Sequence, residues 1–315
     1  MLQKIELIKL INITADNKFN FNRCLNLDQL KDSLDSVGFI YPLIGWRYNT
    51  SILLIDGFKR FHLAKTWSLA ELPFILLPHE YSMLDVIKFR YYNIKHENSE
   101  LNALQKVSIY SLLKTTKLSK IKLDEWIKKL NLIHEEKLLG LMNWPKVAKK
   151  YIYDYNVSLK QVRCFINHDS KTVQEIFSIG VSLNIRIVEL TKIYELVSEI
   201  ALNEDTTIIS VLNKKSIAAI LNNKHINRNQ KIVQLKKILY EWRYPIISKY
   251  QHELANLLKT LSFKNNTHIS FDNSFEKPEI VLSVKLQNEK DLRDLISTIS
   301  NKTNIESLEK MLNLI

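Results

Sequence analysis

The scarcity of glycine is the feature that most limits how this chain can fold. Only five of its 315 residues are glycine. After about residue 80, apolar residues recur at spacings of three and four, which is the period of an amphipathic helix. We therefore expect a mostly helical chain, with a run of helices from Asn102 to Trp242 and one of them opening at Pro145 after "GLMNW".

The N-terminal part departs from that helical pattern. Alternating apolar residues and turn-forming residues predict short strands there, and Leu27, Leu30 and Leu34 mark one face of a helix that Gly38 ends. The expected order is that of a small α/β domain: strand Ile5–Ile13, helix Leu27–Val37, strands Leu43–Trp46 and Ser51–Ile55 around a hairpin loop, and strand Leu72–Leu77.

The C-terminal part combines the apolar spacing of helices with the alternation of strands. A helix is expected from Pro245 to Leu261, followed by segments that alternate like paired strands and by two helices. These later elements are predicted at Thr267–Phe271, Ile280–Leu286, Asp291–Ile299 and Ile305–Leu312.

The fold class predicted from these patterns is α+β. We expect a small α/β domain over residues 1–100, a mostly helical domain with a helix-turn-helix-like segment over 101–245, and a small α+β tail over 246–315 that could serve dimerisation.

Composition narrows the class of partner. The formal net charge of +12 favours polyanionic partners such as nucleic acid, although a solvated lysine-rich surface gives the same excess. No segment approaches the roughly 18 uninterrupted apolar residues of a membrane helix, and Glu6 and Lys9 interrupt the stretch that a signal peptide requires. We expect a cytoplasmic protein with no membrane partner, and Cys24 and Cys164 as reduced structural thiols.

The segment "LLIDGFKRFHLAKTW" carries the clearest chemistry. A glycine between a strand and a helix lets backbone N–H groups approach an anion, and the helix N-terminus adds partial positive charge. Gly57 suits that place, while Lys59 and Arg60 in the first helical turn could neutralise phosphate oxygens. A plain tight turn at Gly57 is the bland alternative.

Three segments in order resemble the ParB/sulfiredoxin superfamily: "LDQLKDSLDSVGFIYPLIGW", "LLIDGFKRFHLAKTWSLAELPFILL" and "YYNIKHENSELNALQKV". They cover roughly the first third of the chain. The middle "MNWPKVAKKYIYDYNVSLKQVRCFI" is similar to the helical stretch that follows the DNA-reading motif of ParB proteins.

The resemblance implies a nucleotide triphosphate at this loop, with CTP and Mg²⁺ as in ParB proteins. Gly57, Phe58, Lys59 and Arg60 would bind the nucleotide, and Asn93 would bind both the nucleotide and the metal ion. ParB proteins usually carry a glutamate where this chain has Phe58, and an acidic residue where it has Tyr92. Two missing carboxylates weaken metal binding and water positioning, so at most a weak CTPase is expected.

The usual arginine-containing segment before the first helix is replaced by "NKFNFNRCLN", in which we nominate Arg23 as a phosphate or partner contact.

DNA contacts are sought in three segments. Leu123–Met142 has the length of a helix-turn-helix, with Asn131 in the turn, although Glu135 and Glu136 are unfavourable near phosphates. Basic residues cluster on the ParB-like stretch "MNWPKVAKKYIYDYNVSLKQVRCFI". They cluster again between Lys214 and Lys249, where an apolar stripe at helical spacing indicates a core-facing helix. The DNA-binding candidates are Lys146, Lys149, Lys150, Lys160, Arg163, Arg228, Lys231 and Lys236.

The predicted function is a ParB-like, DNA-associated homodimer that a bound nucleotide switches between an open and a closed state. Whether the protein has a partner ATPase stays open. Two rivals stay open. "DGFKR" also resembles the phosphate loop of small-molecule kinases of the same superfamily, with Asp56 as the candidate catalytic carboxylate. A degenerate domain that acts only as a DNA or protein adaptor is the other. Sulfiredoxin chemistry requires a cysteine in this loop, and none is present.

Overall fold

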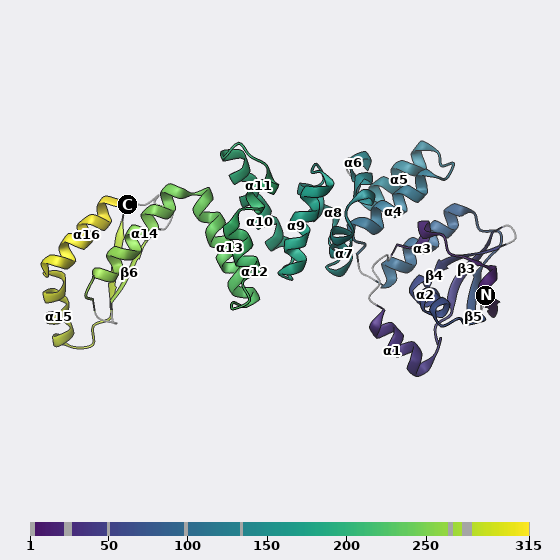
Figure 1. Cartoon of the computed structure of the whole chain (residues 1–315), viewed down its shortest axis with the longest axis horizontal. Coiled ribbons are helices and arrows are strands. Elements are labelled where there is room, and N and C mark those ends of the chain that lie inside the picture. Colours follow the sequence, from purple (N-terminus) through teal and green to yellow (C-terminus); the bar gives the residue numbers. More distant parts are fainter. Residues whose placement is uncertain are drawn as a thin grey trace. The chain divides into compact units, whose positions relative to one another are not determined.

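The computed structural model describes residues 4–21, 27–48, 51–97, 100–132, 135–263, 267–272 and 279–314. The chain forms two compact units, residues 1–192 and 193–315, and the division falls inside helix α10 (Ile187–Asn203) (Figure 1). The three-part division at residues 100 and 245 stays a prediction.

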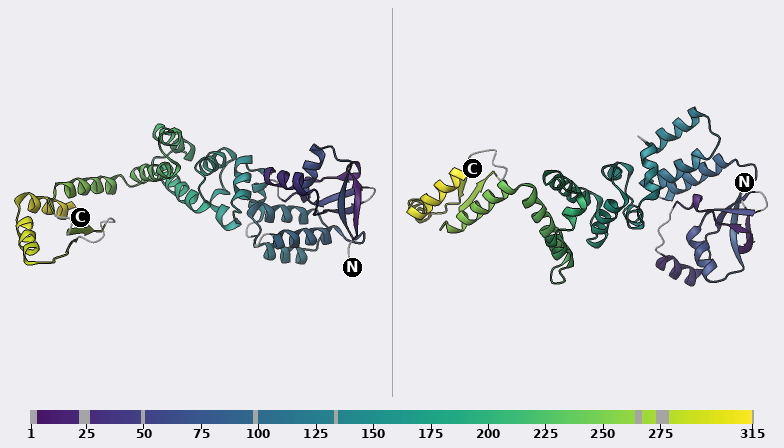
Figure 2. Two further views of the ribbon diagram at one scale, coloured as in Figure 1. Left: turned by 90° about the horizontal axis from the view of Figure 1, so that it is seen from below. Right: turned by 45° about the horizontal axis from the view of Figure 1, so that its top comes forward.

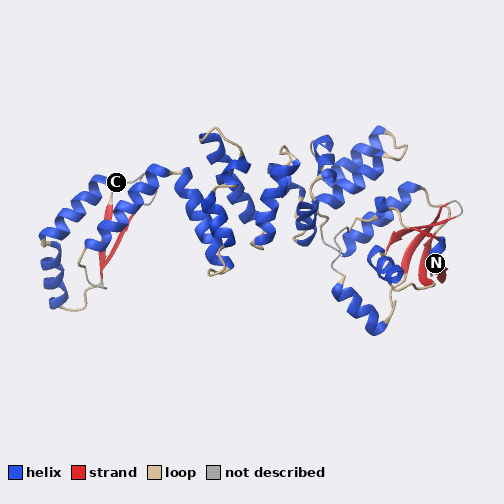
Figure 3. Cartoon of the chain, in the orientation of Figure 1, coloured by secondary structure: helices blue, strands red, loops and turns tan. Residues whose placement is uncertain are grey.

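A five-stranded sheet organises the start of the first unit. Its strand order is β1-β5-β3-β4-β2, with β3 and β4 joined as the predicted antiparallel hairpin and β5 parallel to β3. Figure 3 shows these strands together in red. The strands are β1 (Ile5–Lys9), β2 (Ile13–Thr14), β3 (Leu43–Tyr48), β4 (Ser51–Asp56) and β5 (Glu71–Leu77).

The single strand predicted over Ile5–Ile13 is instead two strands. A 3-10 turn at Leu10–Asn12 separates them, and they pair at opposite edges of the sheet, β1 antiparallel to β5 and β2 parallel to β4. The four Cα steps from Lys9 to Ile13 span at most ~14 Å, whereas the edges of a flat five-stranded sheet lie about 19 Å apart. The sheet must therefore curl, which alternation in the sequence alone does not reveal.

Helices cover both faces of this sheet. On one face, Leu54 and Phe74 form an apolar core with Ala64 of α2 (Phe58–Thr66). Neighbouring residues of β4 point the other way because strand side chains alternate, and they too are buried. On that side β4 contacts α3 (Met83–Glu97) and the 3-10 turn at Asn17–Phe19. Helix α1 (Asp28–Val37) ends at Gly38, as predicted.

The rest of the first unit is helical, as the glycine-poor sequence predicts. Its helix α4 is buried along most of its length and begins with a capping box between Asn102 and Gln105. Pro145 directly precedes α7, again as predicted. The helices are α4 (Ala103–Lys114), α5 (Lys120–Leu130), α6 (Glu135–Leu139), α7 (Lys146–Asp154), α8 (Leu159–Val162) and α9 (Ser170–Ser182).

The second unit combines helices with one hairpin, and Figure 2 shows that hairpin beside α14. The apolar stripe of α13 is core-facing, because Leu235 and Leu239 are fully buried. Asn304, buried in α16, bonds to Ser262 and to the Thr298 carbonyl. The elements are α11 (Ile208–Leu212), α12 (Lys215–Asn222), α13 (Arg228–Arg243), α14 (Pro245–Thr260), β6 (Thr267–Phe271), β7 (Ile280–Val284), α15 (Glu289–Ile299) and α16 (Lys302–Leu314).

Among the described residues, no helix has the length and apolar character needed to cross a bilayer.

Gly180 provides a test of the helical packing. A Cβ at this position would lie 2.9 Å from both Tyr151 Cε2 and Leu190 Cδ2. We expect Gly180→Ala to lower the free energy of unfolding by about 1–3 kcal/mol through overpacking, despite the better helix propensity of alanine. Chemical denaturation measures this change. The matched control is Gly140→Ala, where a Cβ meets nothing within 4 Å; equal stability of the two variants would contradict the packing.

Candidate functional site

The chain bends sharply at Gly57, between the end of β4 and the start of α2. Gly57 is buried and adopts the left-handed conformation, with φ 93° and ψ 22°. A Cβ there would lie 2.9 Å from Leu43 Cγ and 3.3 Å from Arg60 Nη2. Both the backbone angle and the lack of space therefore require glycine, and the predicted turn from strand into helix is confirmed.

A hollow of about 180 Å³ lies beside this bend. The side chain of Phe58 lines it and also packs against the apolar core, so the ring does not fill the space. Four of the five residues predicted to bind nucleotide are in the wall, as is the candidate catalytic residue Asp56. The full lining is Asn20, Leu30, Asp56, Gly57, Phe58, Lys59, Arg60 and Arg90.

Asp56 connects the end of β4 to helix α3. One carboxylate oxygen, Oδ1, lies 2.8 Å from Arg90 Nη1, and the other, Oδ2, accepts a hydrogen bond of 3.1 Å from Asn93 Nδ2. Arg90 is only 1% exposed, and its guanidinium lies over the Phe21 ring at 5.8 Å. Asn93 is therefore connected to the hollow by its hydrogen bond to Asp56. Its side-chain amide oxygen is the atom that would bind a cation.

Arg60 holds the loop that follows α1. Its Nη1 donates to the carbonyl oxygens of Tyr41 and Pro42, the latter at 2.9 Å. The same side chain lines the hollow. Arg60 thus fixes the turn before β3 as well as contributing positive charge to the site.

Arg90 is the residue that sequence reasoning missed. It lies just before "YYNIKHENSELNALQKV", the third of the segments that resemble the ParB/sulfiredoxin superfamily, which starts at Tyr91. A signal was present, since Arg90 falls one helical turn from Val86 and from Ile94, both fully buried. An arginine on the apolar face of a helix needs a buried partner, and Asp56 is that partner.

The hollow suits an anion. Three cations, Lys59, Arg60 and Arg90, face one carboxylate, Asp56. The N-terminus of α2 adds the partial positive charge of its unpaired backbone N–H groups. The geometry can therefore bind phosphate groups.

Comparison with known proteins places this site in context. No family model matches the chain. The chain is 25% identical, over 280 residues, to a probable chromosome-partitioning protein ParB of Rickettsia bellii, covering 86% of this chain and 83% of that protein. The chain is therefore similar to a ParB protein over most of its length.

Solved structures of ParB proteins are also found. One is C-terminally truncated ParB of Caulobacter crescentus complexed with CTP-γ-S, at a TM-score of 0.26 and 13% identity, covering 55% of this chain and 98% of that one. Another is a pNOB8-like ParB N-domain, at a TM-score of 0.32 and 16% identity, covering 75% of this chain and 96% of that one. The likeness to ParB proteins rests on the sequence relationship.

Tyr92 has a different use in this ParB-like chain from the acidic residue that the family pattern predicts. It is 55% exposed, and its hydroxyl accepts a hydrogen bond of 2.7 Å from Lys129 Nζ of α5. That hydrogen bond, with the charge of Lys129, lowers the pKa of Tyr92. Lys129 also lies over the rings of Tyr91, Tyr92 and Trp126, at 4.7, 4.4 and 4.8 Å. Position 92 therefore joins α3 to α5.

The segment predicted to resemble a helix-turn-helix contains α5, a left-handed Asn131 and α6. The second helix is shorter than predicted, because α6 ends at Leu139 and a 3-10 turn, Gly140–Asn143, follows. Ile133 and His134 lie outside the described residues, as does Arg23. A recognition role for this segment stays a prediction.

The predicted DNA contacts divide between the two units. In the first, Lys146, Lys150, Lys160 and Arg163 are exposed and Lys149 is half-buried. In the second, on α13, Lys231 donates to the Leu221 carbonyl at 2.6 Å and so caps α12. Arg228 is exposed, and Lys236 is half-buried.

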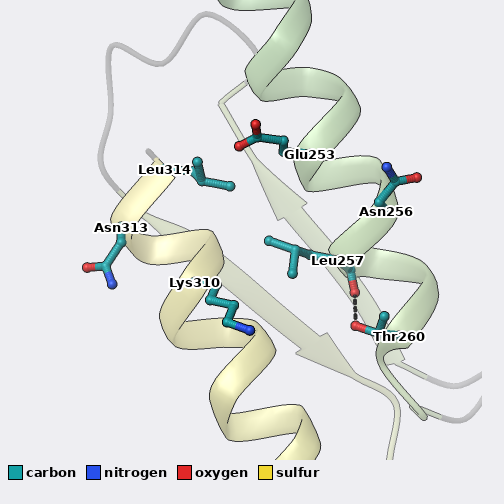
Figure 4. A pocket seen from close by; sticks show the side chains of 7 residues that line it. All are labelled: Glu253, Asn256, Leu257, Thr260, Lys310, Asn313 and Leu314. Carbon is teal, nitrogen blue, oxygen red and sulfur yellow. Dashed lines mark hydrogen bonds between the residues drawn. The ribbon is translucent and has the colours of Figure 1, made fainter.

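A larger hollow of about 440 Å³ lies between α14 and α16 of the second unit (Figure 4). One cation, Lys310, and one acid, Glu253, belong to its wall, so it lacks the excess positive charge of the Gly57 site. The other lining residues are Asn256, Leu257, Thr260, Asn313 and Leu314. Among the described residues, no group of three or more histidine, cysteine or acidic side chains could hold a metal ion.

The bend at Gly57 is tested by substitution with alanine. We expect Gly57→Ala to lower the free energy of unfolding by about 2–4 kcal/mol, because overpacking against Leu43 is added to the cost of the left-handed backbone. A loss of no more than about 1 kcal/mol in a denaturant titration, the size of the backbone cost alone, would show that the predicted close contact at Gly57 is wrong.

Proposed function

We propose that this ParB-like chain is a partition-type factor that binds a nucleoside triphosphate at Gly57 and DNA through its helical middle. The hollow at the N-terminus of α2, lined by Lys59, Arg60 and Arg90, is the observation that carries the proposal. Its volume of about 180 Å³ is below the ~300–1,000 Å³ of pockets that enclose whole ligands. The phosphates would enter it, and the nucleoside would lie outside.

CTP with Mg²⁺ is the proposed ligand because of the family resemblance. Mg²⁺ keeps several waters and is held mainly by phosphate oxygens with one or two protein groups. The donors present fit that mode: the Asn93 amide oxygen, next to the Asp56 carboxylate. Hydrolysis is expected to be weak or absent, since both Asp56 oxygens are engaged and positions 58 and 92 are aromatic. That engagement also makes Asp56 a poor general base for a kinase reaction.

DNA contact through the first unit is supported by exposed cations around α7 and α8. Lys146 and Lys150 on α7, with Lys160 and Arg163 after it, are available to bind phosphates of the DNA backbone without reading its sequence. The helix-turn-helix-like segment α5–α6 is the proposed reader of bases.

Dimerisation through the second unit is supported by its uncovered apolar side chains. Strands β6 and β7 form a two-stranded sheet, which is marginal alone, and no other described strand pairs with either of its edges. Val281 and Leu282 on β7 and Leu292 and Ile296 on α15 are exposed, and α15 has no buried residue. A second copy would cover this surface, and nucleotide binding would bias the dimer between open and closed states.

Nucleotide choice separates this function from its rivals. Calorimetric titration with CTP, ATP and ADP, with and without Mg²⁺, is expected to give binding of CTP alone. Adenine nucleotide preference would favour the kinase, and no heat with any nucleotide would favour the adaptor. Either result contradicts the proposal.

DNA binding is expected to weaken steeply between low and moderate salt, because each phosphate contact releases counterions. In Lys146→Gln/Lys150→Gln, the slope of log K against log salt should become shallower by about 2. Fluorescence anisotropy measures this slope. The control is Lys65→Gln/Lys95→Gln, which removes two other exposed lysines of the same unit. An equal change in the control would refute contact through α7.

A further inference from the structure

Arg90 is unusual for a charged side chain, because it is the largest of the fully buried residues that the structure describes. It stands in the wall of the hollow at Gly57, 2.8 Å from Asp56 and over the Phe21 ring. Asn93, one helical turn later, bonds to the other oxygen of the same carboxylate. Two direct contacts therefore hold the guanidinium beside a cavity, and Asn93 holds its acidic partner.

Stability alone does not explain such a pair. Removing two charges from water costs several kcal/mol per ion, and well-packed apolar residues in place of a buried pair are often as stable or more stable. A buried pair beside a cation-lined cavity is better explained by a ligand that uses one of its members. The ligand must be an anion, because the cations exceed the acids there.

We propose that Arg90 is the cation that binds a phosphate group in this hollow, and that Asp56 is its resident counter-ion, which positions Arg90 and competes with the phosphate. This inference rests on the proposed nucleotide site, and it adds a residue to that site. Arginine suits the role because its planar group can bond to Asp56 with one edge and to a phosphate with another.

The roles of the three cations then differ. Arg60 is tied to the carbonyls of Tyr41 and Pro42, so its first task is to hold the loop before β3. Lys59 is a flexible point charge in the first turn of α2. Arg90 alone of the three is held by a buried ion pair in the part of the chain that the structure describes.

The two members of the pair predict effects of opposite sign. Arg90→Met should weaken binding of inorganic tripolyphosphate, titrated without Mg²⁺, about tenfold or more, the size of one lost charge-assisted hydrogen bond. Asp56→Asn should tighten it several-fold, because the side chain keeps its size while the charge that competes with the phosphate for Arg90 is gone. A purely structural pair would instead give losses in both variants. Calorimetry measures each affinity, and circular dichroism verifies folding.

Two further variants keep the test decisive. Asp56→Asn/Arg90→Met removes both charges, so it avoids an unpaired buried acid and should stay folded while binding weakly. Lys88→Met is the control for loss of one positive charge on α3. Lys88 is exposed and lies 3.6 Å from Asp85, and its loss should change the affinity less than twofold.

CTP, titrated in parallel, distinguishes this inference from the proposed function. If the wild type binds CTP and the folded Arg90 variants bind it equally well, the inference is wrong and the function stands. If the wild type binds tripolyphosphate but not CTP, and Arg90→Met loses that binding, Arg90 is a phosphate-binding residue and the nucleotide function is wrong. Wild-type protein that binds neither overturns both.

Discussion

The ion pair between Asp56 and Arg90 joins the two halves of the N-terminal fold. Asp56 is the last residue of β4, and Arg90 lies in the middle of α3, so the pair fixes a helix against the end of a strand. Gly57 is the next residue after Asp56, so the direction of the bend there depends on where β4 ends. Most of the wall of the hollow is thus built from one strand end, one helix start and one buried side chain from another helix, and Asn20 and Leu30 complete it.

Much of this arrangement could be predicted from the sequence. Strand alternation, the segment "RYNT" after Trp46, and the lone glycine after Asp56 are local signals. They predicted the antiparallel pairing of β3 with β4 and the turn into α2, although β3 extends to Tyr48, inside the predicted loop. The loop residues Gly57 to Arg60 were nominated for the same reason. The split of Ile5–Ile13 was missed because it follows from pairing with distant strands. Arg90 was missed because its importance depends on a partner 34 positions away.

Aromatic residues connect this site to the following helices. Tyr91 and Tyr92 follow Arg90 directly on α3, and together with Trp126 they surround the ammonium group of Lys129 on α5. Cation–π contacts of this kind contribute about 0.5–2 kcal/mol each. A displacement of α3 at the hollow would therefore be felt by α5, the first helix of the segment proposed to read DNA.

The curled sheet also constrains the order in which the parts of this unit can fold. Residues 5–14 are synthesised before their partners, which lie in β4 and β5, more than 35 residues later in the chain. The segment can reach both sheet edges only after the central hairpin and β5 have assembled. Contacts of such sequence separation slow folding, because loop closure precedes any gain from pairing. Until then, both edges of the nascent sheet are open to other chains.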